Sequence, residues 1–285
     1  MKIYSLVGYA AIGLQLLISA TLAPESLGPW WGMVVGFGYL LLLWFSGGIY
    51  ISNILHMGIS HRALVYKPWF VNSVMLVNNL FFLYVDPVRW TNLHRLHHKY
   101  SDRTGDPHKV SDDGFWRTLY LCFAIYPVTE NLAKDDIFKT WSFRLVSHPM
   151  FKHIAFVTSC GTLWLLFGDF LFAIGIWFFA RMFALWVNMI QNFWCHDRRF
   201  GTRRYDDAND STNIGEWLPV VGTFSACWQN NHHHHPHLLR NTHDPDEFDF
   251  GYMTVRWLNS LGVVKASRTG SILPSASVLT NVTLD

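Results

Sequence analysis

Long apolar stretches constrain this chain most, because about 20 apolar residues in a row are enough to cross a bilayer as a helix. Four such stretches cover residues 3–22, 30–55, 153–167 and 170–194. The third is short, but only the turn Gly168-Asp169 separates it from the fourth, so the two predict a helical hairpin. The sequence therefore predicts an all-α integral membrane protein with four transmembrane helices.

Two other interpretations of these stretches stay open at this point. The first stretch has Lys2 before it and small residues near its end, as in a secretory signal. However, the second stretch is equally apolar and still has to be placed in lipid. A buried hairpin of a soluble protein is disfavoured by the unbroken apolar run 39–45 and by Trp30 and Trp31, which suit a membrane interface.

The distribution of basic residues predicts which side each loop faces. The segment between the second and third stretches is rich in Lys and Arg, whereas the turns at 23–29 and 168–169 have none. By the positive-inside tendency, both termini and this long segment face the cytoplasm. The apolar residues 71–84 are interrupted by Asn72, Asn78 and Asn79, and we expect a cytoplasmic helix against the membrane or under the bundle rather than a fifth span.

These features predict one domain over residues 1–264. Its helical cytoplasmic cap comprises residues 56–152 and 195–264, and a polar tail follows at 265–285. The net charge of +2 and the absence of a basic, aromatic stripe argue against nucleic acid as a partner. The four cysteines are far apart, so neither a zinc knuckle nor a disulfide framework is indicated.

Most of the 15 histidines fall into four groups at or beyond the predicted cytoplasmic helix ends. HMGISH holds His56 and His61, HRLHH holds His94, His97 and His98, NFWCH holds Asn192 and His196, and QNNHHHHPH holds Gln229, His232, His233, His234, His235 and His237. On a helix, residues three and four apart share a face, so one turn can direct several imidazoles to a common point. Together the groups predict a polyhistidine metal site.

Residue type alone leaves the metal open, because imidazole suits Fe, Zn, Cu and Ni. The number of ligands narrows the choice, since one tetrahedral zinc uses four whereas eight histidines suffice for two ions of higher coordination. The run of four histidines also fits a tag or a metal-scavenging tract. Its place between Trp228 and further patterned sequence argues against that.

The motifs HMGISHRALVYKPW, RWTNLHRLHHKYSDRTGDPH, NFWCHDRRFGTRRYDD and WQNNHHHHP, in this order, resemble the histidine boxes of membrane fatty-acyl desaturases of the stearoyl-CoA desaturase-like group. The resemblance covers residues 47–264. It implies four transmembrane helices, a cytoplasmic cap with a di-iron centre, and a tunnel for an acyl chain. It also implies two Fe ions that use O2 and two external electrons to remove two hydrogens from neighbouring methylenes.

Carried over by position, the resemblance implies that the iron ligands are His56, His61, His94, His97, His98, His196, His232 and His233. Asn192 matches an asparagine that approaches one iron. Gln229 is the departure, because most relatives have histidine there, and His234 or His235 is a possible substitute. This leaves a hydroxylase, an acetylenase or a decarboxylase as alternatives to desaturation of an acyl chain on CoA, carrier protein or lipid.

Other residues are candidates for supporting roles. Asp106 and His108 are possible outer partners of the ligand imidazoles, although a simple turn explains them equally well. The predicted walls of the substrate channel are aromatic: Trp69, Trp90, Phe193, Trp194 and Trp228, with Phe81 and Phe82. Arg198, Arg199, Arg203 and Arg204 either receive an anionic partner or follow the positive-inside tendency. The sequence has no haem or flavin signature, so a ferredoxin, rubredoxin or cytochrome b5-like donor is expected.

A histidine-rich membrane metal sensor or transporter is the rival from another class. Transporters place ionisable ligands within their spans, near the bilayer midplane. Here the apolar stretches are almost free of ionisable groups, Arg181 being the main exception. This favours a metal site outside the lipid, as an oxygenase requires.

Overall fold

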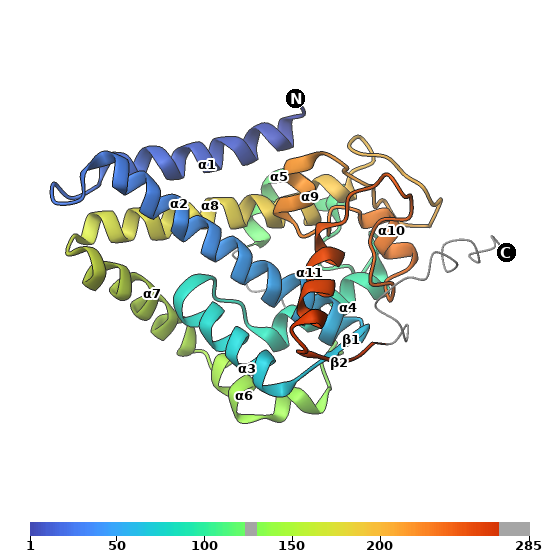
Figure 1. Ribbon diagram of the computed structural model, residues 1–285. Helices are drawn as coiled ribbons and strands as arrows, with labels where there is room; N and C mark the ends of the chain where they lie inside the picture. The colour runs from blue at the N-terminus through green and yellow to red at the C-terminus, as the bar shows by residue number, and fades with distance from the viewer. Residues whose placement is uncertain (123–129, 268–285) are drawn as a thin grey trace.

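The computed structural model describes residues 1–122 and 130–267, and its regular secondary structure is almost entirely helical (Figure 1). The first part contains α1 (Ile3–Thr21), α2 (Gly28–Gly47), the π-helix η1 (Gly48–Ser60), β1 (Leu64–Tyr66), α3 (Pro68–Val77), the π-helical η2 (Asn78–Phe82), α4 (Pro87–Tyr100) and α5 (Val110–Leu121). The second contains η3 (Asp136–Lys139), α6 (Trp141–Val146), α7 (Phe151–Phe167), α8 (Phe170–Asn192), η4 (Trp194–His196), α9 (Trp217–Gly222), α10 (Gln229–His234), α11 (Phe250–Ser260) and β2 (Val264–Ser267).

Among the described residues, three helices are long and apolar enough to cross a membrane: Ile3–Thr21, Gly28–Ser60 and Phe170–His196. The predicted third span, α7, has 17 residues and falls short of that length. The predicted hairpin is present, because Gly168 ends α7 in the left-handed conformation and the Asp169 carboxylate accepts a bond from Phe172 N at the start of α8. If the bent helix pair over residues 68–82 and 87–100 counts as one span, the described residues contain four candidate spans instead of three.

The spans pack closely through small residues. Gly36 of α2 lies so near α1 that a Cβ there would approach the Ser19 hydroxyl to 1.8 Å. Between these helices, the buried Gln15 amide of α1 donates to Gly36 O of α2 at 2.9 Å and to Ile176 O of α8 at 3.3 Å. Close backbone approach and buried amide hydrogen bonds are the means by which helices associate where water gives no driving force.

A helical segment with a sharp break follows the second span. Helix α3 and η2 run together over residues 68–82, and α4 then leaves at an angle of 101°. Asp86 caps α4 by accepting from Val88 N and Arg89 N, and Pro87 occupies its first turn. The segment 71–84 is thus helical, as predicted, with its break at residues 83–86.

Short helices and loops form a cap at one end of the bundle, opposite the turn between α7 and α8 (Figure 1). The start of α1 lies beside this cap, since Tyr4 donates to Glu216 at 2.6 Å. The prediction of an all-α fold missed one element, a short two-stranded sheet. Its strands β1 and β2 pair antiparallel with a bulge between Val65 and Tyr66. Residues 265–267, predicted as part of the polar tail, belong to β2, and the rest of that tail lies outside the described residues.

Candidate metal centre

The first histidine pair owes its geometry to a π-helix. The 20 residues of α2 span about 30 Å, the thickness of a bilayer core, so η1 extends beyond the length needed to cross. Hydrogen bonds in a π-helix join residues five apart, and His61 N donates to His56 O at 3.0 Å. The five-residue spacing of HMGISH therefore stacks His56 and His61 on one side, which an α-helix does not do.

Helix α4 distributes its three histidines between two groups of imidazoles. One group, the five-histidine cluster, contains His56, His61, His94, His98 and His232. The other, the three-histidine cluster, contains His97, His196 and His233. In each cluster one nitrogen per ring lies within 4.8 Å of those of the others.

Two helices contribute to both clusters through neighbouring residues. In α4, His98 joins the five-histidine cluster and His97 the three-histidine cluster, and in α10, His232 and His233 divide in the same way. The rings of His98 and His233 stack across the boundary with centroids 4.4 Å apart. The clusters are therefore adjacent and share a scaffold, the arrangement expected of a paired-metal centre.

The imidazoles meet through their Nε2 atoms. Nε2 of His56 lies 2.9 Å from that of His232, and the corresponding distance between His61 and His94 is 2.8 Å. Nε2 of His232 is also 3.2 Å from that of His98. A metal cation is the group that so many convergent imidazole nitrogens fit.

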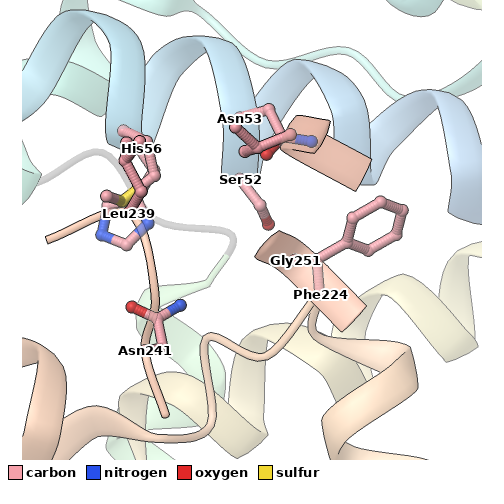
Figure 2. A pocket seen from close by; sticks show the side chains of 9 residues that line it. Ser52, Asn53, His56, Phe224, Leu239, Asn241 and Gly251 are labelled. Carbon is pink, nitrogen blue, oxygen red and sulfur yellow. The ribbon is translucent and has the colours of Figure 1, made fainter. Parts of the chain in front are cut away.

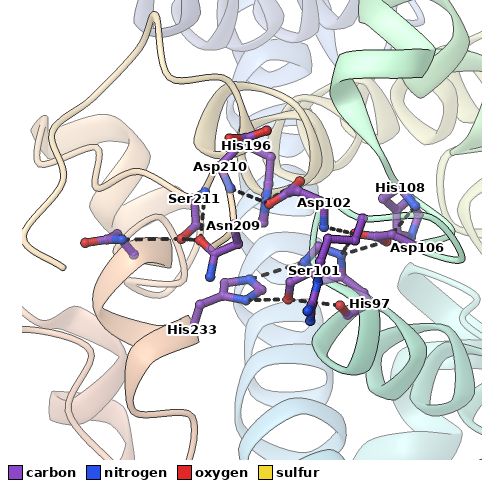
Figure 3. Close-up of polar contacts among 12 residues, drawn as sticks. His97, Ser101, Asp102, Asp106, His108, His196, Asn209, Asp210, Ser211 and His233 are labelled. Atoms are coloured by element: carbon purple, nitrogen blue, oxygen red, sulfur yellow. Dashed lines mark hydrogen bonds and ion pairs between the residues drawn. The ribbon is translucent and has the colours of Figure 1, made fainter. Parts of the chain in front are cut away.

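Carboxylates and a hydroxyl hold the outer nitrogens of the three-histidine cluster (Figure 3). Nδ1 of His97 lies 3.0 Å from both Asp106 oxygens, and Nδ1 of His196 lies 3.0 and 3.1 Å from those of Asp102. Nδ1 of His233 is 3.1 Å from the Ser101 hydroxyl. Such partners fix the Nδ1–H tautomer and leave Nε2 free to bind metal.

Burial and neighbouring groups together determine the pKa values in this cluster. Burial alone would raise the pKa of Asp106, but the His97 imidazole and backbone N–H donors hold that pKa well below its usual value. Asp102 behaves alike, with His196 lowering its pKa against the effect of burial. Burial also lowers the pKa of His233 far below its usual value, so this imidazole is neutral and able to bind metal near pH 7.

The five-histidine cluster is fixed mainly by packing and by Arg95. The Trp90 ring stacks on His94 with a centroid distance of 4.9 Å. The Arg95 guanidinium donates to Ile59 O at 2.7 Å and to Ser60 O at 3.2 Å, at the end of η1. Arg95 thereby links α4, which carries the second histidine box, to the end of η1, which carries the first.

A cavity of about 10 Å³, room for one water molecule, lies against His56 (Figure 2). Its lining includes Asn53, Phe224, Leu239 and Asn241, and the buried Asn241 Oδ1 has no hydrogen-bond partner among the described residues. Nδ1 of His232 is likewise buried without one. The cavity is far too small for an acyl chain.

Several other predicted site residues have partners that are not ligand imidazoles. The Asn192 amide donates to Asn188 Oδ1, and the buried Gln229 amide donates to Ala226 O at 2.7 Å. His234 stacks on Tyr205 and contacts Asp207, so its imidazole is not at the centre. The structure brings together all eight histidines that were predicted as ligands.

The other candidates lie at varying distances from the clusters. His235 packs on His234 with a centroid distance of 4.4 Å, away from both clusters. His108 is 6.0 Å from His97 by centroid, and its backbone N donates to Asp106, which supports an outer role for Asp106. Burial lowers the pKa of His108 to about 4.

The predicted channel aromatics divide into two kinds. Trp90 contacts His94, Phe193 and Trp194 are buried beside the third histidine box, and Trp228 lines a cavity of about 440 Å³ with Tyr4 and Glu216. Trp69 is 60% exposed on the outside of α3, so it does not fit a channel wall.

Sequence reasoning missed Asp102, Ser101 and Arg95. The first two directly follow HRLHH in the sequence, but they contact imidazoles of later boxes, Asp102 that of His196 and Ser101 that of His233. The arginines after the fourth span are engaged within the cap, since Arg198 pairs with Asp210, Arg199 with Asp197 and Arg204 with Asp244. Arg203 donates to the carbonyls of Asn209 and Ser211.

Comparison with known proteins agrees with this geometry. The family model for fatty acid desaturases matches residues 29–256. The chain is 30% identical over 233 residues to the sn-1 stearoyl-lipid 9-desaturase of Anabaena variabilis, covering 79% of this chain and 80% of that protein. It is 26% identical to the Delta-9 acyl-lipid desaturase 2 of Arabidopsis thaliana, covering 78% and 71%.

A relative with another acyl carrier in its name is also similar. The acyl-CoA 5-desaturase AL21 of Anemone leveillei is 25% identical over 213 residues, covering 73% of this chain and 64% of that protein. The family match spans all four histidine boxes and the helices that carry them. With its apolar helices and paired imidazole clusters, this chain belongs to the fatty acid desaturase family.

Proposed function

We propose that this protein is an O2-dependent di-iron desaturase that introduces a double bond into a fatty-acyl chain. One observation carries the proposal: eight imidazoles from four separate helical segments form two adjacent clusters in a membrane protein of the desaturase family. When bound, a pair of iron ions supplies the O2-activating chemistry that removal of two unactivated hydrogens requires.

The proposed iron ligands are the Nε2 atoms of His56, His61, His94, His98 and His232 for one ion and of His97, His196 and His233 for the other. The second ion has fewer imidazoles, so it has room for an additional weak ligand. Asn192 and Gln229 are the nearest candidates in sequence, directly or through water. In the three-histidine cluster, Asp102, Asp106 and Ser101 hold the outer nitrogens and keep the three imidazoles in the metal-binding tautomer.

The aromatic residues around the clusters are proposed to guide the acyl chain and keep water out. Trp90 is stacked on a ligand ring, and Phe193, Trp194 and Trp228 are at most 8% exposed. An apolar wall of this kind favours a hydrocarbon over water. Because the described cavity at His56 is small, entry of the chain requires these side chains to move.

The substrate and the electron donor follow from the family and from the chemistry. Relatives named for acyl-lipid desaturation favour an acyl chain linked to a membrane lipid, with CoA or carrier-protein esters as alternatives. The reaction consumes two electrons, which we assign to a ferredoxin, a rubredoxin or a cytochrome b5-like protein. The ion pairs of Arg198, Arg199 and Arg204 leave these cations less available for such a donor.

We further propose that α7 joins the three longer helices as a fourth span, so that residues 1–264 form one domain with both termini and the cap in the cytoplasm. The lysines and arginines of the middle segment support this orientation. The contact between Tyr4 and Glu216 supports a common side for the N-terminus and the cap.

Lipid analysis tests the proposal. Cells that express the chain with a competent donor are expected to gain a monounsaturated acyl chain by mass spectrometry, and the His94→Ala variant is expected to give none. Unchanged lipids from a protein that carries two irons would contradict desaturation. An added hydroxyl, a triple bond or a shortened chain would assign the protein to the hydroxylase, acetylenase or decarboxylase alternative that Gln229 leaves open.

Metal analysis tests the remaining rival. The desaturase proposal expects about two Fe per chain, the count of a paired-metal site, together with O2 consumption. A reversible zinc site with no reaction with O2 would support a metal sensor instead.

A further inference from the structure

Arg181 lies in the middle of the membrane helix α8, eleven residues from Phe170 and eleven from Asn192. At 1.5 Å per residue, its Cα is about 16 Å from either end of the helix. No carboxylate pairs with it among the described residues. Ionisable residues at this depth are costly and persist where they bind backbone carbonyls or another polar group.

The Arg181 guanidinium binds the end of η2 instead of a carboxylate. It donates to Phe82 O, to Trp177 O at 2.6 Å and to the Tyr39 hydroxyl at 3.3 Å. It also lies over the Trp177 ring at 3.7 Å from the centroid. The Tyr39 hydroxyl in turn donates to Phe81 O at 3.1 Å. Arg181 and Tyr39, from two spans, thus cap the last two carbonyls of η2.

Side chains also satisfy the rest of the break between η2 and α4. The Asn78 amide donates to Leu83 O at 2.7 Å, and Asn79 Oδ1 accepts from Val85 N at 2.6 Å. The Tyr50 hydroxyl donates to Val85 O at 3.4 Å. Exposed loops have water for these groups, whereas irregular backbone at membrane depth needs partners from the protein.

The outer face of this segment is suited to lipid. Trp69, Ser73, Val77 and Phe81 are exposed and recur every four residues, so they form one stripe along α3 and η2. The three large residues of the stripe are 60%, 47% and 37% exposed. Charged residues are absent from 68–85, which would leave an apolar face in water if the segment lay in the cytoplasm.

We propose that residues 68–86 form a re-entrant segment that reaches the middle of the bilayer, with its stripe against lipid acyl chains and Arg181 as the positioning residue at its tip. This replaces the expectation of a helix on the membrane surface. Because α4 begins directly at the capped break, the same contacts set where the HRLHH box starts. The depth of the segment requires no metal, so this proposal is independent of the proposed function.

Spin labels measure the depth. Phe81→Cys, Trp69→Cys and, as a cap control, Trp116→Cys are each labelled in a Cys122→Ser background and placed in phosphatidylcholine vesicles. Trp116 is 77% exposed in α5. We expect collisions with O2 to exceed those with a water-soluble nickel chelate at residue 81, the reverse at 116, and an intermediate ratio at 69. The proposal would be wrong if the label at residue 81 gave the same ratio of O2 collisions to chelate collisions as the label at residue 116.

Variants of the cap then test Arg181 with the label at residue 81. Arg181→Met leaves the Phe82 carbonyl without its hydrogen-bond donor and is expected to raise access of the chelate to the label. Arg181→Lys keeps a cation with fewer donors and is expected to raise that access less. Arg117→Met, at a surface arginine paired with Asp113, is the control and leaves access unchanged. If Arg181→Met does not fold, Tyr39→Phe removes the bond to Phe81 O alone. Unchanged access in the variant that folds would refute the role of Arg181.

Discussion

Asp102→Asn is the sharpest test of the paired clusters. The Asp102 side chain is 3% exposed, its carboxylate lies 3.0 and 3.1 Å from His196 Nδ1, and it accepts a further bond from Asp210 N. Asparagine keeps the shape, and it tolerates the positive φ of 59° at this position. The substitution therefore removes the buried negative charge behind one imidazole and little else.

The loss of such an outer partner weakens metal binding by roughly 10- to 100-fold, or about 1.4–2.7 kcal/mol. Because Asp102 contacts only the three-histidine cluster, we expect one iron per chain to be lost at a lower chelator concentration while the other remains. Metal content is measured by mass spectrometry after equilibration with graded chelator.

Asp207→Asn is the matched control for this experiment. Asp207 also lies 3.0 Å from an imidazole nitrogen, that of His234, but outside both clusters. It is expected to retain both irons like the parent protein. Retention of both irons by Asp102→Asn, or parallel loss of both from it, would refute the assignment of Asp102 to one of two separate sites.

Three further predictions address the fold, the pH response and the unusual glutamine. Gly36→Ala forces a methyl group against Ser19 and is expected to lower the free energy of unfolding by about 1–3 kcal/mol in thermal or denaturant unfolding. Gly38→Ala, whose methyl group meets no atom of the described residues within 4 Å, is expected to be neutral. Burial lowers the pKa of His243 to about 4, below the value of about 6.5 for an unfolded chain, so the unfolded state binds the proton first and stability falls as pH drops from 6.5 to 4. His243→Gln should reduce this slope in unfolding measured across that range, and an unchanged slope would exclude His243 as its source. Gln229→His is expected to retain both irons by metal analysis, and loss of iron would mean that the pocket requires an amide.

The sequence predicted those features that depend on one dominant property. Apolar length placed the helices, and the capping pair Gly168-Asp169 placed the hairpin. The histidine groups stood out because histidine accumulates where metals or protons are handled, and the choice of eight ligands among them came from the resemblance to the desaturase family. The division into clusters was not predictable, because it depends on the rotation of α4 and α10, which places adjacent residues such as His97 and His98 on different sides.

Supporting residues were harder to predict because their roles depend on contacts distant in the sequence. Asp102 meets His196 across 94 positions, and Arg95 reaches the end of η1 across 35 or 36. The exposed position of Trp69 was not foreseen because an aromatic residue near a histidine box serves a channel or a lipid contact equally well. The two-stranded pairing of β1 with β2 was missed because both strands are only three or four residues long.

The wide helical turn that carries HMGISH has a consequence for how this part of the chain varies. Its bond from His61 N to His56 O and its five-residue spacing depend on each other. Deleting one residue between the two histidines would restore ordinary α-helical winding but rotate everything that follows, including Arg62 and β1. Substitutions between His56 and His61 are therefore expected to be tolerated better than an insertion or a deletion there.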